Sequence, residues 1–502
     1  MNAFLGLFKF IIVVALIVFS VVIVVCGVLV LFPSFKLFGL HYISGDANQE
    51  VETVSLSGTD FNNADKIRFK TDTFDVYLRT VKSSQLYDNG DITIENFHRL
   101  SGFVWGDVEF PSLLEPTTIT ENGQTILVIQ LAEPSGVLFK TNACMAINCV
   151  TGAFANKDIE IQTTSGSVYV GDVITKDDSN NINSSITVLK NIGITCDTGA
   201  IDVRSCNITG ELNVKKLSGN LTVERDLTND ANISISAGFG KINLQNVGSS
   251  TTTANLVLNS IDNSDIVVGA VYGDTILVAN GGLLRMNYVQ EELSVNSTAC
   301  DIQVTRIGQN LIVDGNEGKI DIDVVEGNVT INQSSGSVDI AEVDGTMDIE
   351  TTRGNINLPN VSHYAKIRTT FGAVNIVCDG TSIFNLDIRT QSGAVNVENL
   401  LGSITYQVVN NGTANVNVEF LAIRGVNTIQ TEAGNINITV PTATDYYLKW
   451  STTRSVDIQL YSYQSTDKTG QKGMGETDIQ EDYAKQILLT SIVGSISVIK
   501  NV

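Results

Sequence analysis

A short alternation of polar and aliphatic residues recurs along most of the chain. Each unit begins with glycine and then places a small polar side chain between two aliphatic ones, as in GKIDI from Gly318 and GNVTI from Gly327. A period of two puts the aliphatic side chains on one face of a β-strand and the polar ones on the other. Each unit therefore predicts a short strand with one buried face, entered through a corner at glycine. The units begin at Gly166, Gly199, Gly210, Gly219, Gly240, Gly318, Gly327, Gly336, Gly345, Gly354, Gly372, Gly393, Gly402, Gly434 and Gly494.

The glycines from Gly318 to Gly354 are spaced nine residues apart, which is the signature of a repeat architecture. No helical stretch separates the strands, so crossover helices cannot join them as parallel neighbours. A β-solenoid solves this, because each strand then pairs with the strand one coil later. Two units per coil give a coil of about 18 residues, and wider spacings elsewhere indicate about 20. The inward residues are expected to stack as aliphatic ladders, for example Ile320, Val338, Ile356 and Val374.

The outward position between the two aliphatic residues holds Asn, Asp, Thr or Ser in every unit except one, where it is Tyr169. Stacked Asn and Thr side chains can form hydrogen bonds along a ladder, and interspersed Asp keeps such a face soluble.

An apolar segment precedes the repeats. Residues 11–32 contain no charged residue, and Ser20 is the only hydroxyl among them. A helix of this length spans the roughly 30 Å hydrocarbon core of a bilayer. The run is longer than the core of a cleaved signal peptide, which favours an uncleaved anchor. Lys9 and Lys36 flank it almost symmetrically, so charge does not decide the orientation. We expect the usual arrangement for such an anchor, with the N-terminus in the cytoplasm and the C-terminal domain outside the cell.

The predicted fold is all-β: a single-stack parallel β-solenoid, or β-helix, with irregular caps, preceded by one transmembrane helix. Open solenoid ends need capping, and residues 41–110 and 441–502 are less regular than the rest. The expected organisation is a cytoplasmic N-terminus at 1–10, a transmembrane helix at 11–32, a juxtamembrane linker and start of the cap at 33–63, solenoid repeats at 64–440, and the last coils and cap at 441–502.

Charge restricts the partners. The chain of 502 residues carries 31 basic against 54 acidic side chains, a net charge of −23. Nucleic acid and anionic lipid surfaces both select basic proteins, so the folded part is not expected to bind either one. The membrane is contacted through residues 11–32.

The Gly-x-aliphatic-x-aliphatic units resemble the putative adhesin family, a β-solenoid domain of unknown function found in membrane-anchored surface proteins. The segments from Thr439 to Leu460 and from Leu488 to Ile499 also resemble its C-terminal end, and the resemblance covers roughly residues 64–500. It implies a solenoid fold and an adhesive role. It implies no catalytic residues, because none are recognised for the family.

Two pairs of acids are the strongest candidates for chemistry. In an 18-residue coil Asp321 stacks on Asp339, and Glu326 on Asp344. Carboxylates about 5 Å apart either recruit a cation or raise one pKa. The pairs are therefore candidate calcium ligands, and an acid pair for glycoside cleavage is the alternative. The plainest interpretation is a solvated acidic ladder, since no aromatic or arginine platform for a sugar is evident.

Other catalytic signals are missing from the sequence. It contains no nucleophile elbow, no phosphate-binding loop and no zinc-binding helix motif, and His41, His98 and His363 are scattered. We predict no catalytic residues, no cofactor other than calcium, and no enzyme activity. Cys144 and Cys149 lie close enough in sequence to suggest a disulfide in an oxidising compartment.

The sequence favours a membrane-anchored, non-enzymatic surface protein whose acidic solenoid serves adhesion, recognition or envelope structure. Its ligand, a surface glycan or a protein, is unknown. One alternative is a polysaccharide-acting β-helix enzyme, which rests on fold analogy alone. Another is an intracellular membrane-tethered scaffold that self-associates, for which reduced cysteines would be evidence.

Overall fold

The computed structural model describes residues 2–32, 36–43, 49–56, 59–80, 92–100, 102–132, 135–137, 141–150, 152–171, 187–204, 206–224, 231–382, 384–408, 412–442, 445–460, 463–474 and 484–501. Strands account for 68% of the chain, so the predicted all-β class and the β-solenoid are confirmed. The chain forms two compact units, Met1–Glu224 and Arg225–Val502.

The first unit contains both helices, α1 (Asn2–Leu31) and α2 (Thr59–Asn63). Its strands are β1 (Leu40–Ile43), β2 (Gln49–Leu56), β3 (Lys66–Lys70), β4 (Asp75–Thr80), β5 (Ile92–Leu100), β6 (Gly102–Glu109), β7 (Thr117–Glu121), β8 (Gln124–Gln130), β9 (Ser135–Val137), β10 (Thr141–Cys149), β11 (Phe154–Thr163), β12 (Val168–Val170), β13 (Thr187–Cys196), β14 (Ile201–Arg204), β15 (Cys206–Ile208), β16 (Glu211–Ser218) and β17 (Leu221–Glu224).

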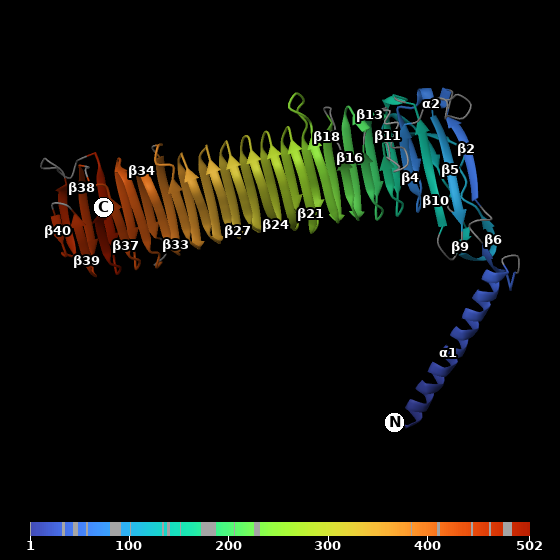
Figure 1. Cartoon of the computed structure of the whole chain (residues 1–502), viewed down its shortest axis with the longest axis horizontal. Helices are drawn as coiled ribbons and strands as arrows, with labels where there is room; N and C mark the ends of the chain where they lie inside the picture. The colour runs from blue at the N-terminus through green and yellow to red at the C-terminus, as the bar shows by residue number, and fades with distance from the viewer. Residues whose placement is uncertain are drawn as a thin grey trace, which may run out of the picture. The chain divides into compact units, whose positions relative to one another are not determined.

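Parallel coils in this unit follow an antiparallel start (Figure 1). One row of strands runs β2–β5–β10–β4–β12–β14–β17, and its first two pairings are antiparallel. The other runs β7–β8–β3–β11–β13–β16, and only its first pairing is antiparallel. The coil of β3 and β4 therefore lies between strands that come later in the chain. A small separate sheet has the order β1–β6–β9.

The second unit is built from β18 (Asn232–Phe239), β19 (Lys241–Val247), β20 (Leu256–Ile261), β21 (Ser264–Val271), β22 (Thr275–Ala279), β23 (Gly282–Val289), β24 (Leu293–Ile307), β25 (Leu311–Glu317), β26 (Ile320–Val325), β27 (Val329–Ser335), β28 (Val338–Val343), β29 (Met347–Arg353), β30 (Ile356–Val361), β31 (Ala365–Phe371), β32 (Val374–Cys378), β33 (Phe384–Ser392), β34 (Val395–Val408), β35 (Val416–Ile423), β36 (Val426–Thr431), β37 (Ile436–Val440), β38 (Tyr446–Thr452), β39 (Val456–Leu460), β40 (Tyr463–Ser465), β41 (Thr469–Met474), β42 (Gln486–Ser491) and β43 (Ile496–Lys500).

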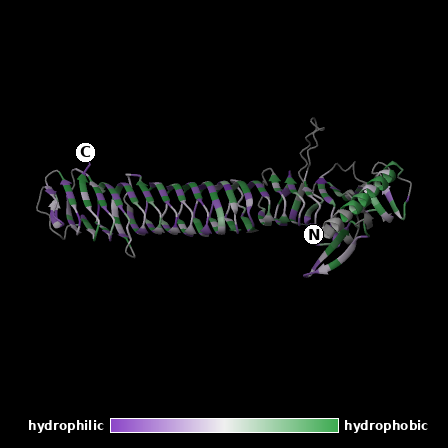
Figure 2. Ribbon diagram, turned by 90° about the horizontal axis from the view of Figure 1, so that it is seen from below, coloured by the Kyte–Doolittle hydropathy of each residue, from purple (hydrophilic) through white to green (hydrophobic). Residues whose placement is uncertain are grey.

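From β20 to β37 the strands of the second unit stack in parallel, each on the strand one coil earlier (Figure 1). Ile320, Val338, Ile356 and Val374 are register partners in successive coils, each at most 1% exposed. The predicted ladder and its 18-residue coil are thus confirmed. Figure 2 shows that hydrophobic and hydrophilic residues alternate along these strands. In β26 and β28 the buried positions are the hydrophobic ones, and the polar side chains lie outside the core. Burial of such ladders is the main source of stability, at about 1.5–3 kcal/mol for each large aliphatic side chain.

Buried hydroxyl groups form hydrogen bonds with the main chain at two corners of the solenoid. Thr431 donates a hydrogen bond to the main-chain oxygen of Gly434 over 2.7 Å, and the main-chain N–H of Gly494 donates one to Ser491 over 2.9 Å. In both cases the polar residue stands three positions before the glycine and is at most 1% exposed. These bonds satisfy main-chain groups that the tight turn removes from the strand ladder.

The C-terminal strands do not occupy the last coil. Strand β42 pairs in parallel with both β36 and β38, and β43 pairs with both β37 and β39. The chain therefore builds a farther coil from β38 and β39 and returns to fill the space before it. Antiparallel β40 and β41 then flank β39 and β38, which gives this unit an end of different geometry from its parallel coils.

Helix α1 is the one helix, among the described residues, that is long and apolar enough to cross a membrane. The qualifying segment is Ile11–Leu31, with a mean hydropathy of 3.4. Its side chains are largely exposed, as a lipid-facing helix requires, except that Leu29 is fully buried near the end that contacts β1.

Candidate binding surface

One outward column of the second unit carries the predicted acids. Successive strands place these residues in register, each one coil from the next: Gln303, Asp321, Asp339, Asn357, Asn375, Asn396, Asn417 and Asn437. From Asp321 onward the column thus changes from carboxylates to amides. A ligand on this face would meet negative charge on β26 and β28 and uncharged hydrogen-bonding groups from β30 to β37.

The structure brings Asp321 and Asp339 together, but with a lysine between them. The Nζ atom of Lys319 lies 2.9 Å from a carboxylate oxygen of Asp321 and 3.6 Å from one of Asp339. The hydroxyl of Ser337 also donates to Asp339 over 3.2 Å. Hydrogen bonding to Asp321 raises the pKa of Lys319, so the lysine stays charged. An ammonium group thus neutralises part of the charge that would attract a cation.

The second acid pair follows the paired residues Val325 and Val343, at the corner after each strand. Glu326 forms an ion pair with Arg306 of the preceding coil, and Asp344 bonds through its main-chain N–H to the carbonyl of Val325. Calcium takes six to eight oxygen ligands. Within the described part of the chain, no three His, Cys, Asp or Glu side chains are grouped for metal binding. Calcium binding therefore remains a prediction.

The amide part of the column forms a continuous hydrogen-bonded ladder. Asn396 donates to Asn375 over 2.8 Å, Asn417 to Asn396 over 2.6 Å, and Asn437 to Asn417 over 2.8 Å. The two inner amides, Asn396 and Asn417, each use one N–H and the oxygen within the ladder, which leaves the second N–H and an oxygen lone pair for a ligand. The predicted ladder of stacked Asn side chains is thus confirmed. The result is a row of fixed donors and acceptors that repeats once per coil.

A second outward face carries charges of both signs. Lys366 pairs with Asp348 at 2.5 Å, and Arg368 lies between Asp348 and Asp387 at 3.7 and 3.9 Å. Arg389 continues the network to Asp387 at 3.6 Å. This network was not predicted. The alternation of charge at intervals of one coil is the signal that could have revealed it, once the register was known.

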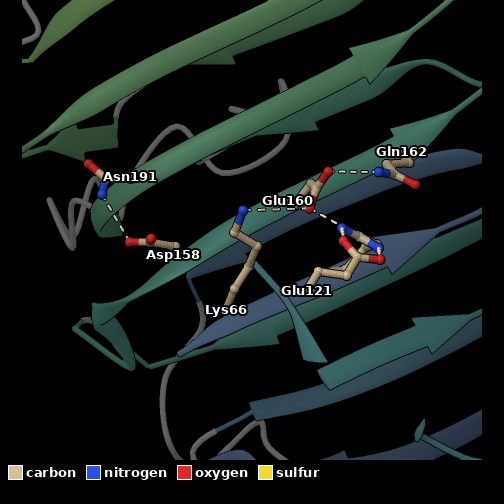
Figure 3. Close-up of polar contacts among 7 residues, drawn as sticks. Lys66, Glu121, Asp158, Glu160, Gln162 and Asn191 are labelled. Atoms are coloured by element: carbon tan, nitrogen blue, oxygen red, sulfur yellow. Dashed lines mark hydrogen bonds and ion pairs between the residues drawn. The ribbon is translucent and has the colours of Figure 1, made fainter. Parts of the chain in front are cut away.

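An arginine connects three strands of the first unit, and the residues around it are labelled in Figure 3. Arg68 of β3 forms two bonds with Glu121 of β7, at 3.0 and 2.7 Å, and one with Glu160 of β11 at 2.9 Å. Gln162 donates to the other oxygen of Glu160 over 2.7 Å, while Lys66 lies 3.8 Å from Glu160. The paired arrangement fixes the β7–β8 hairpin to the neighbouring coil, because a guanidinium matches a carboxylate in two places.

The same view shows a second contact on β11. Asn191 of β13 donates to a carboxylate oxygen of Asp158 over 2.9 Å, and Lys190 lies 3.6 Å from that oxygen. All these groups are paired with one another, so their chemistry is structural.

The exceptional outward residue Tyr169 has an aromatic partner. Its ring stacks on Tyr77 of the adjacent strand, with centroids 4.7 Å apart and planes at 10°. Burial raises the pKa of Tyr77 to about 12. Two aromatic residues of the second unit are instead buried: Tyr406 bonds to Thr390 over 2.9 Å, and Trp450 is only 2% exposed. The alternation separates these cases, because it places Tyr169 at an outward position and Tyr406 at an inward one. It does not reveal Tyr77 as the stacking partner of Tyr169.

The structure does not bring Cys144 and Cys149 together. Both belong to β10, and no disulfide joins them within the described part of the chain. Five residues along a strand separate their Cα atoms by about 16 Å and point them to opposite faces. A disulfide requires Cα atoms within about 7 Å, so a bridge would have to break this strand.

Comparisons with known proteins agree with the fold. Residues 272–407 and 362–498 match the family described as Toastrack DUF4097. The chain resembles that family, as its sequence predicted. The first unit lies outside the matched residues. No protein of curated function matches the chain.

Two solved structures are also similar. One is a putative cell adhesion protein from Clostridium sporogenes, with 8% identity over 90% of this chain and all of the other, and a TM-score of 0.15. The second is a putative adhesin from Parabacteroides distasonis, with 10% identity over 74% of this chain and 99% of the other, and a TM-score of 0.16.

Proposed function

We propose that the protein is a non-enzymatic, single-pass surface protein that displays its solenoid outside the cell for adhesion or recognition. The amide ladder from Asn375 to Asn437 is the observation that carries the proposal. It offers unsatisfied hydrogen-bonding groups at a fixed repeat on a stiff parallel sheet. A repeating polar ligand, such as a surface glycan, matches such a row better than a compact small molecule does, because several weak contacts add along its length.

The acidic composition supports recognition of an uncharged or basic partner over an anionic one. The resemblance to adhesin-like Toastrack proteins supports the same role. Helix α1 supports attachment to a membrane, and residues 1–10 then form the cytoplasmic end.

Topology is tested first. A protease added to intact cells of the source organism is expected to remove a C-terminal tag from the full-length chain. Protection of the tag until the membrane is opened would contradict the proposal and favour an intracellular scaffold.

The ladder is tested by two matched double variants of the full-length chain, displayed on cells and assayed on glycan arrays. Asn396→Asp with Asn417→Asp changes two amides of the ladder to carboxylates. Gln407→Glu with Gln430→Glu makes the same chemical change at two exposed register partners on another strand face. Binding should be lost in the first variant and kept in the second. Equal binding by the two double variants would show that the amide ladder is not part of the recognition surface.

A further inference from the structure

The first unit exposes two large apolar side chains close to the end of α1. Phe38 is 87% exposed and Trp105 is 61% exposed. The two lie beside each other in the β1–β6 region: Leu40 is the register partner of Trp105, and the indole packs within 3.5 Å of the position of a Cβ on Gly39. Single exposed apolar residues are common on soluble proteins, but a neighbouring pair of exposed aromatic side chains forms an apolar patch, and such patches mark contacts with a protein or a membrane.

Phe38 occupies a strained position. Leu37 and Leu40 exchange main-chain hydrogen bonds of 2.8 and 2.9 Å, which closes a two-residue turn. Both central residues have positive φ, 51° at Phe38 and 85° at Gly39. Such turns select Asn, Asp or Gly at the first central position, and a bulky residue there costs free energy. An apolar partner at the tip of this turn would explain why a phenylalanine is kept there in spite of the strain and its exposure.

The chain itself identifies that partner. Phe38 follows the end of α1 at Leu31 by only seven positions, so the turn lies within about 25 Å of the helix end. Leu29 is fully buried, and α1 contacts β1, so the sheet lies against the end of the helix. Leu31 and Phe32 are 74% and 63% exposed. If α1 spans a bilayer, these residues and the turn lie at its boundary, where the polar headgroup zone is roughly 5–8 Å thick on each side.

We propose that the turn Leu37–Leu40 and Trp105 form a lipid-interface anchor that holds the first unit against the headgroups of the bilayer. Tryptophan is enriched in this zone because its ring is apolar and its N–H is polar. Lys36 and Asp107 form an ion pair of 3.2 Å beside the turn, and both are well exposed, which suits the polar side of the same boundary. The inference rests on the membrane attachment proposed above. It adds that the folded domain touches the lipid.

Trp105 is a built-in reporter. The chain has two tryptophans. The other one, Trp450, is 2% exposed, and its indole N–H donates to the carbonyl of Asp467 over 2.9 Å. The full-length protein is placed in vesicles of phosphatidylcholine with a minority of phosphatidylglycerol, prepared with bromine either near the carbonyls or deep in the acyl chains. The difference in emission between the native protein and Trp105→Phe isolates Trp105 without altering Trp450.

We expect bromine near the carbonyls to quench Trp105 severalfold more than deep bromine does, and aqueous iodide to quench it weakly. Strong quenching by iodide with none by brominated lipid would overturn the anchor. Trp105→Phe alone should respond to neither reagent, since its remaining indole is buried.

Phe38→Asn separates a membrane role from a structural one. Asparagine suits the turn, so the variant should melt at the same or a higher temperature than the native protein. Its Trp105 should nevertheless become severalfold more accessible to iodide. Unchanged quenching in a well-folded variant would overturn the role of Phe38. Flotation of the same vesicles distinguishes the failure of this proposal from the failure of membrane attachment. If the protein floats with the vesicles but lipid bromine does not quench Trp105, only the interface anchor is contradicted. If the protein does not float, membrane attachment is contradicted as well.

Discussion

A Cβ atom on Gly354 would overlap the main-chain carbonyl of Gly336, the glycine one coil earlier. The same relationship joins Gly372 to Gly354 and Gly393 to Gly372, so one corner of the solenoid is a column of glycines in contact. Each also has a positive φ, for example 139° at Gly354. Glycine is thus required here twice, for its backbone conformation and for the close approach of the coils.

We therefore expect Gly354→Ala to destabilise the second unit by about 2–4 kcal/mol, because it combines backbone strain with a collision between main chains. Chemical denaturation monitored by circular dichroism measures the change. Gly315→Ala is the matched control, since the nearest atom to its Cβ would be 3.5 Å away and its φ is not positive. A loss in the control as large as that in Gly354→Ala would show that the corner is not special.

The amide ladder makes a prediction with a defined pH dependence. In Asn396→Asp the new side chain loses the N–H that bonds to the oxygen of Asn375, and an ionised carboxylate would face that oxygen. Folding should then raise the pKa of the new carboxyl group, because the protonated form can still donate. The destabilisation, about 1–2 kcal/mol, is expected in full above the folded pKa and to diminish as pH falls toward the unfolded value.

The free energy of unfolding of Asn396→Asp, measured by denaturation at neutral pH and at about pH 4, where carboxyl groups ordinarily titrate, tests this dependence. Gln407→Glu lies on an exposed outward position and should show little of it. A destabilisation of Asn396→Asp that does not change with pH would argue against a direct amide ladder.

Arg68 predicts the acid behaviour of the first unit. Its hydrogen bonds lower the pKa of the Glu121 carboxyl group. A depressed folded pKa contributes stability above the unfolded pKa of about 4.3, and that contribution is lost as pH falls through the folded value. Glu121→Gln should therefore lower the melting temperature at neutral pH and leave it nearly unchanged in strong acid. The exposed Glu115→Gln should have no effect at either pH, and identical acid profiles for both variants would contradict the assignment.

Lys319 determines how the acid pair responds to calcium. Because its ammonium group contacts both Asp321 and Asp339, Lys319→Met leaves two carboxylates without their cation. We expect millimolar calcium to raise the melting temperature of Lys319→Met more than that of the native protein. Lys366→Met removes a lysine from the other charged face and serves as the control. Calcium affinity that is equal in all three proteins would place any calcium site elsewhere.

Much of the fold could be predicted from the sequence because one physical rule repeats in it. Alternation indicated which side chains are buried, and the nine-residue spacing indicated the coil, so the partners of Ile320 and Val338 followed by counting. The same counting placed Asp321 on Asp339. It could not supply Lys319, since a flexible side chain two residues away can point along the strand or across it.

Order along the stack was harder to predict. Strand β42 lies between β36 and β38, although β38 comes before it in the chain. All three strands alternate in the same way, so the hydrophobic pattern alone does not predict which of them are neighbours in the sheet. The charge pairs show the same limit. Arg68 and Glu121 are 53 residues apart and meet only because the hairpin of β7 and β8 returns to β3.

The cysteines are predicted to stay reduced whether the solenoid lies inside or outside the cell. Burial raises the pKa of Cys206 to about 12 and that of Cys300 to about 11, and it raises the pKa of Cys144 and Cys196 as well. The thiolate is the reactive form, so these groups should resist both alkylation and oxidation in the folded protein. Free thiols are then expected even outside the cell, and reduced cysteine is no longer evidence for the cytoplasm.

Alkylation in denaturant without reductant, followed by mass spectrometry, should find all six cysteines outside α1 modified, whereas the folded protein should be modified slowly. Cys149→Ala is the matched control: it should leave the labelling of Cys144 unchanged, because the two thiols lie on opposite faces of β10. Two unmodified cysteines in the native protein, with Cys144 becoming reactive only in Cys149→Ala, would establish the disulfide and require a broken β10.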